Sequence, residues 1–247
     1  MLKQLKFDFY KLVKSKTLLV FWILPILLIL VNPVLSYVIQ GGKSSVFAEL
    51  NSSSSSLFLA IIVFAVLLTA KDFSSGYIKN IYSFSDKLCY ILSKIIYFFA
   101  FCLIYLIAEF LINAFFNAIT GVCLIYDAEF DKFTVGSFFL STFTEALNGT
   151  AIGTLCCFLC VLFKKEYIVL IIVLLYLFVG NMGIYVAINT VIGHGFSIQT
   201  YTLFGFWPRF DYKNLFWEMI MPGVIVPVCY ALVFGFFSWL VVKFRNV

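Results

Sequence analysis

The chain has 247 residues, of which 63% are hydrophobic and 12% are charged, about half the charged fraction of a soluble globular domain. So few charges cannot cover so much apolar surface in water, which excludes an ordinary cytosolic enzyme, a disordered chain and a secreted disulfide-rich scaffold. The composition and the net charge of +5 instead indicate an integral membrane protein.

The first predicted element is a basic amphipathic helix over residues 1–16. Its apolar residues recur at helical spacing, while lysines occupy much of the remaining surface; the apolar set is Leu2, Leu5, Phe9, Leu12 and Val13. We expect this helix to lie along the inner face of the membrane. The alternative is a lysine cluster that only directs topology.

Six stretches are long and apolar enough to cross about 30 Å of hydrocarbon as helices. They are Leu18–Ile39, Ser54–Ala70, Ile95–Thr120, Phe138–Phe163, Tyr167–Ile188 and Ile220–Val242. With the N-terminus inside, the predicted cytoplasmic pieces hold 13 of the 17 Lys and Arg residues, as the positive-inside rule requires. The sequence therefore predicts one all-α transmembrane domain over residues 1–247, with six spans and both termini in the cytoplasm.

The seven cysteines do not form a disulfide framework, because most of them lie inside predicted spans. Cys156, Cys157 and Cys160 have a spacing that suggests a metal site. No histidine or further cysteine is placed to complete a tetrahedral set, so helix packing is the favoured interpretation. No metal is predicted.

The connection over residues 71–94 is much longer than the roughly 2–8 residues that join adjacent helices. Its pattern predicts a short helix, a turn and a second helix that runs into the third span. The first of these helices has an apolar face, made by Phe73, Tyr77, Ile78 and Ile81. Such a face on a cytoplasmic loop indicates docking onto a cytosolic partner; a merely solvated loop is the alternative.

The run from Asp72 to Asn80, Asp-Phe-Ser-Ser-Gly-Tyr-Ile-Lys-Asn, resembles the cytoplasmic signature of type-2 ABC exporter permeases. In that family an acidic-aromatic start and Gly-x-Ile-Lys-Asn follow span two. A second half, with a basic residue and a terminal Ser-Lys, then enters span three; Lys87, Tyr90, Ser93 and Lys94 are similar to it. The family usually has Arg where Lys87 stands and Gly or Pro near Phe84. The layout of the whole chain also matches the family.

The resemblance implies a coupling helix after span two that binds a separate ATPase subunit. The implied coupling residues are Asp72, Phe73, Gly76, Tyr77, Ile78, Lys79, Asn80 and Lys87. It also implies two copies of a cytosolic ABC ATPase and a second permease, identical or related. This chain would then have no enzymatic activity and no cofactor of its own, while ATP and Mg²⁺ would bind the partner. The absence of a G-x-x-x-x-G-K-[ST] phosphate loop agrees with that division.

Two carboxylates lie within predicted spans, Glu109 in the third and Glu145 in the fourth. Each is costly in hydrocarbon, so each is expected to face protein or water. Polar side chains share their helical faces: Asn113 and Asn117 follow Glu109, and Ser141 and Asn148 flank Glu145. This stripe is either a path for an amphipathic, cationic substrate or a set of interhelical hydrogen bonds.

Residues 189–219 form a predicted external segment crowded with aromatic residues. Rings of this kind prefer the membrane boundary, so the segment is expected to dip into it. Resemblance to the family implies short re-entrant helices that form an outer gate, with Phe204, Phe206, Trp207 and Phe210 as candidate gate residues. An aromatic belt without a gating role is the alternative.

Taken with the resemblance, these features predict the transmembrane subunit of an ATP-driven exporter in a bacterial cytoplasmic membrane. The expected cargo is a peptide, a peptide antibiotic such as a lantibiotic, or another amphipathic molecule; membrane lipid is the other partner, and no nucleic acid is expected. Two alternatives remain. One is an ion-coupled secondary carrier that uses the glutamates, and the other is the substrate-binding subunit of a vitamin importer.

Overall fold

The computed structural model describes residues 2–14, 23, 25–31, 54–74, 86–120, 135–177, 203 and 216–244. Every regular element in these residues is helical, which confirms the all-α class. The elements are α1 (Leu2–Lys14), α4 (Ser54–Ser74), α6 (Lys87–Thr120), α7 (Val135–Phe163), α8 (Glu166–Leu175), the π-helix η5 (Phe216–Ile225) and α10 (Val226–Phe244). Residues 25–31 are also helical.

Four of these helices are long and apolar enough to cross a membrane. The qualifying stretches are Ser56–Phe73, Lys87–Phe116, Phe138–Phe163 and Phe216–Phe244, which overlap the predicted second, third, fourth and sixth spans. The chain is therefore a membrane-embedded protein. Helix α8 covers the start of the predicted fifth span, and most of the first span lies outside the described residues.

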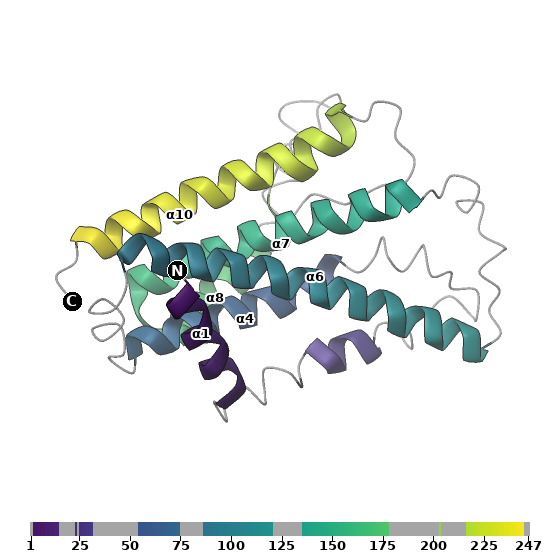
Figure 1. Cartoon of the computed structure of the whole chain (residues 1–247), viewed down its shortest axis with the longest axis horizontal. Coiled ribbons are helices and arrows are strands. Elements are labelled where there is room, and N and C mark those ends of the chain that lie inside the picture. The colour runs from purple at the N-terminus through teal and green to yellow at the C-terminus, as the bar shows by residue number, and fades with distance from the viewer. Residues whose placement is uncertain are drawn as a thin grey trace.

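The long helices pack as a bundle whose directions follow from contacts between named residues (Figure 1). Tyr90 of α6 contacts Asp72 of α4, and Glu109 contacts Ser56, so these two helices are antiparallel. Helix α10 ends where α6 begins, because the Lys87 amine donates to the Val242 carbonyl at 3.2 Å. Helices α4 and α10 thus run one way and α6 runs the other.

Two glycines let α7 approach α6 closely. A Cβ on Gly149 would lie 2.7 Å from the Cys102 sulfur, and one on Gly153 would lie 2.9 Å from the Phe98 ring. The two glycines are four residues apart on one helical face, the small-x-x-x-small spacing that brings membrane helices together. They fix an antiparallel register in which Gly149 is level with Cys102 and Gly153 with Phe98.

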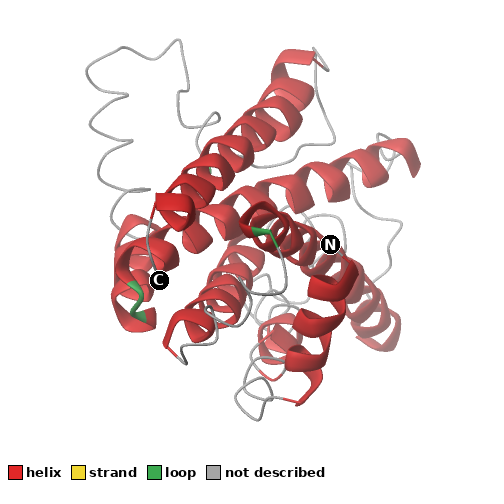
Figure 2. Cartoon of the chain, turned by 60° about the vertical axis from the view of Figure 1, so that its left-hand side comes forward, coloured by secondary structure: helices red, strands yellow, loops and turns green. Residues whose placement is uncertain are grey.

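The helices of the bundle differ in how deeply they are buried. In the apolar stretch of α4, 72% of the residues are buried, whereas 11% are buried in the stretch that joins η5 and α10. Helix α4 therefore lies inside the bundle, and α10 lies along its outside (Figure 1). Figure 2 shows that the regular elements around them are all helices. The outward residues of α10 are apolar, as a lipid-facing surface requires; they include Val228, Leu232, Phe236 and Phe237.

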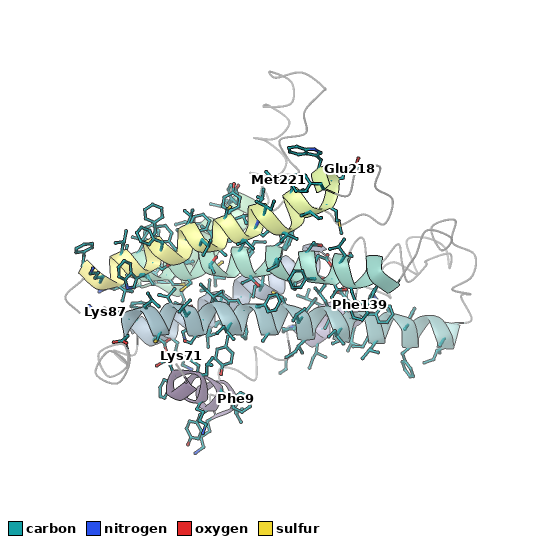
Figure 3. All side chains as sticks on the ribbon, turned by 45° about the horizontal axis from the view of Figure 1, so that its top comes forward. Phe9, Lys71, Lys87, Phe139, Glu218 and Met221 are labelled. Atoms are coloured by element: carbon teal, nitrogen blue, oxygen red, sulfur yellow. The ribbon has the colours of Figure 1, made fainter. Side chains whose placement is uncertain are left out.

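Helix α1 crosses the bundle next to α6, and it confirms the predicted N-terminal helix (Figure 3). It presents Gln4 and Asp8 to the bundle, both buried, while Phe9 and Val13 stay exposed. Of the other residues of the predicted apolar face, Leu5 is half-buried, and the side chains of Leu2 and Leu12 lie outside the described residues. Phe7 packs against the core. The exposed Phe9 and Val13 of α1 suit contact with lipid. Its membrane position stays a prediction.

Candidate functional site

A buried ion cluster joins α1, α4 and α6 at one end of the bundle. The Lys94 amine of α6 lies 2.8 Å from Asp8 Oδ1 of α1 and 3.0 Å from Asp72 Oδ2 of α4. All three side chains are fully buried. We call these three residues the end cluster.

Neutral donors complete the end cluster. The Tyr90 hydroxyl donates to Asp72 Oδ2 at 3.0 Å, and Ser93 Oγ lies 3.1 Å from Asp8 Oδ2. The Gln4 amide donates to the same oxygen at 3.4 Å. One ammonium faces two carboxylates, so these donors help to offset the surplus negative charge.

Asp8 is the member of the end cluster that the sequence analysis missed. It was overlooked because the apolar period and the lysines dominate residues 1–16. The available signal was its charge: Asp8 is the only acidic residue in the first 48, and it stands among five lysines. A single carboxylate in an otherwise basic amphipathic helix predicts contact with another part of the protein.

The first seven implied coupling residues, from Asp72 to Asn80, divide into three sets. The Asp72 carboxylate is buried and engaged by Lys94 and Tyr90, so in this structure it joins helices within the chain. Phe73 is half-buried against the core. Gly76, Tyr77, Ile78, Lys79 and Asn80 lie outside the described residues.

Lys87 begins α6 and contacts the end of α10. Its amine lies 3.2 Å from the Val242 carbonyl and 3.4 Å from the Lys243 carbonyl. The final carbonyls of a helix lack intrahelical partners and carry partial negative charge, so a lysine there stabilises the helix end. Together with the end cluster, Lys87 ties the start of α6 to α1, α4 and α10.

A second buried polar group lies deeper in the bundle, between α4, α6 and α7. Ser56 Oγ of α4 donates to Glu109 Oε1 of α6 at 3.1 Å. Glu109 is 0% exposed and Glu145 of α7 is 3% exposed. We call Ser56, Glu109, Asn113, Glu145 and Asn148 the mid-membrane cluster.

The alignment of α7 on α6, set by Gly149 and Gly153, shows how far apart the two glutamates lie along the bundle. Since Gly149 is level with Cys102, Glu145 is level with about residue 106 of α6. Glu109 is three residues further along, roughly 4.5 Å at 1.5 Å per residue. The carboxylates thus occupy neighbouring turns of facing helices rather than one level.

The two asparagines of the mid-membrane cluster have unsatisfied polar atoms. Asn113 and Asn148 are each 1% exposed, and Asn113 Oδ1 and Asn148 Nδ2 have no hydrogen-bond partner among the described residues. A buried polar atom without a partner is costly. Asn113 Oδ1 is an acceptor and Asn148 Nδ2 is a donor, and the alignment of α7 on α6 places them about ten residues apart along α6, roughly 15 Å. Each atom therefore needs its own water molecule or polar ligand group.

Several predicted residues of the path and the gate lie outside the part of the chain that the structure describes. Asn117 lies in α6, but its side chain is outside the described residues, as are Phe204, Phe206, Trp207 and Phe210. The end of the predicted aromatic segment is described: the Phe216 and Trp217 rings pack edge to face at 5.3 Å and are exposed.

The three clustered cysteines pack inside the bundle. Cys156, Cys157 and Cys160 are buried and carry free thiols. The Cys160 sulfur lies 4.0 Å from the Val66 carbonyl, so it faces α4. Within the described residues, no group of three or more His, Cys, Asp or Glu side chains is arranged to hold a metal ion.

No family profile, curated protein or solved structure matches this chain.

Proposed function

We propose that this chain is the transmembrane subunit of an ATP-driven exporter of the type-2 ABC permease kind. The end cluster is the observation that carries the proposal. Asp72 and Lys94 belong to the two helices that flank the predicted coupling segment, and their ion pair holds those helices together with α1. A force applied to the coupling segment would act on α1, α4 and α6 as one unit.

The same helices reach the mid-membrane cluster. Helix α4 is continuous from Ser56 to Asp72, a rise of roughly 24 Å. A displacement at the end cluster would therefore reach Ser56 and its partner Glu109 without an intervening hinge in α4. We propose that the mid-membrane cluster lines the path of a peptide, a peptide antibiotic or another amphipathic cargo.

The directions of the described helices also agree with six passages of the chain across the membrane. Helix α1 lies near the end of α4, so the chain between Lys14 and Ser54 must travel the length of the bundle. Helices α7 and α10 run the same way, so the chain between Phe163 and Phe216 must return as well. The predicted first and fifth spans would supply these passages.

The rest of the proposal follows the resemblance. Two cytosolic ATPase subunits would bind ATP and Mg²⁺, and a second permease would complete the path in a bacterial cytoplasmic membrane. Co-expression with the neighbouring genes tests this assembly. We expect an ATPase subunit to co-purify with the chain and to hydrolyse ATP faster when cargo is added. Purification of the chain without any ATPase subunit would contradict the proposal.

One observation favours a second candidate, an ion-coupled carrier. Glu109 and Glu145 are buried carboxylates inside predicted spans whose sequences contain no lysine or arginine. Buried carboxylates within membrane spans are typical of carriers that bind protons or small cations. Proton- or sodium-driven uptake by the chain alone in vesicles would favour this candidate over the exporter.

A further inference from the structure

An apolar groove runs along the outside of the bundle between α6 and α10. Its volume is about 670 Å³, within the range of about 300–1,000 Å³ typical of small-molecule sites. Leu88, Ile95 and Phe99 line it from α6, and Ala231, Leu232 and Trp239 from α10. Among the described residues that line it, Thr150 of α7 is the one with a hydroxyl group, and that hydroxyl already donates to the Ala146 carbonyl.

The groove has the length of one leaflet of a bilayer. Its lining on α6 extends from Leu88 to Phe99, a rise of roughly 16 Å. Half of the hydrocarbon core measures about 15 Å. A single acyl chain that starts at the membrane surface would therefore fill the groove from end to end. Apart from the Trp239 indole N–H, the described lining offers a polar ligand no side-chain hydrogen-bonding group besides the engaged Thr150 hydroxyl.

One end of the groove carries positive charge. Lys87 precedes the lining residue Leu88, and its amine contacts the Lys243 carbonyl, so both lysines stand at this end. The Lys243 amine lies 4.8 Å above the Trp239 ring. A tryptophan beside two lysines at the end of an apolar stretch is typical of the level where lipid headgroups lie.

We propose that the groove binds one anionic phospholipid, with an acyl chain between α6 and α10 and the phosphate beside Lys87 and Lys243. The apolar lining favours an acyl chain, and the length of the groove favours a lipid of the adjacent leaflet. The two lysines favour a negatively charged headgroup. This site requires that the protein is embedded in a membrane and is independent of any ATPase partner.

Native mass spectrometry of the full chain with phosphatidylglycerol and phosphatidylcholine tests the site. We expect one phosphatidylglycerol to stay bound under conditions that remove phosphatidylcholine. Ala231→Phe fills the groove and should abolish this retention. Lys243→Gln removes one charge at its mouth and should weaken retention about fivefold, because a lysine near an anionic surface contributes about 1 kcal/mol.

Two matched variants serve as controls. Val233→Phe adds the same ring to a lipid-exposed residue of α10 that does not line the groove, and Lys165→Gln removes a charge at the turn between α7 and α8. Both should retain phosphatidylglycerol as the wild type does. Equal retention of the two lipids, or unchanged retention in Ala231→Phe and Lys243→Gln, would overturn the proposal. So would a dimer that Ala231→Phe dissociates while phosphatidylglycerol stays bound, since the groove would then seat a second copy.

Discussion

The end cluster and the mid-membrane cluster are both buried and both contain two carboxylates, yet they differ in charge balance. Lys94 stands between Asp8 and Asp72 and contacts both. The mid-membrane cluster contains Glu109 and Glu145 but no lysine or arginine, and two of its asparagine atoms have no hydrogen-bond partner in the part of the chain that the structure describes. In the end cluster, residues of the chain itself balance the charges, so that cluster stabilises the fold. In the mid-membrane cluster, polar atoms are left for water or a ligand to bind, so that cluster is the better candidate for a binding site. The two clusters should therefore respond differently to substitution.

Removal of Lys94 should have the largest effect. Lys94→Met keeps most of the volume but leaves Asp8 and Asp72 buried without their ammonium. Loss of one partner of a buried ion pair costs about 3–5 kcal/mol. We expect a marked loss of folded protein, measured by thermal unfolding in detergent. The double change of Lys94→Met with Asp8→Asn should recover part of that stability, and no recovery would argue against an ionic role.

Neutralising Asp8 alone should have a moderate effect. Asp8→Asn removes one contact between α1 and α6 and leaves Lys94 paired with Asp72. A hydrogen bond to a charged group contributes about 1.5–3 kcal/mol, so α1 should detach before the rest of the bundle unfolds. Hydrogen exchange should show faster exchange in residues 2–14 and little change in α7. Uniformly faster exchange would mean that α1 is not a separable element.

Neutralising the glutamates should have the smallest effect on stability. Glu109→Gln and Glu145→Gln keep the shape and remove the charge, and an interhelical hydrogen bond in a membrane contributes only about 0.6 kcal/mol on average. We expect wild-type unfolding temperatures. Transport should fall roughly tenfold or more if a carboxylate contacts the cargo, since such a contact contributes about 1.5–3 kcal/mol. Unfolded variants would assign the glutamates to structure.

The sequence was a better guide to the helices than to the contacts between them. The expected second span starts at Ser54 and the fourth ends at Phe163, as α4 and α7 do, because hydropathy and length alone decide where a membrane helix lies. The second half of the 71–94 connection was expected to be a helix that runs into span three, and α6 does begin at Lys87.

The partners of the buried charges were not predictable in the same way. Ser56 and Glu109 are 53 residues apart in the chain, and Asp8 and Lys94 are 86 apart. Such pairs depend on helix register, which is set by close contacts such as those of Gly149 and Gly153. A local pattern identifies the polar face of one helix but not the helix that it meets.

The most direct test of the account is ATPase docking at the coupling segment. In the proposed assembly Ile78 contacts the ATPase subunit, and burial of an unpaired carboxylate there would weaken docking on the order of a hundredfold or more. We predict that Ile78→Asp stays folded in the membrane and loses the co-purifying ATPase subunit, while Lys213→Asp, in the predicted external segment, retains it. An Ile78→Asp complex that co-purifies at the wild-type ratio, and that still hydrolyses ATP when cargo is added, would contradict the coupling assignment.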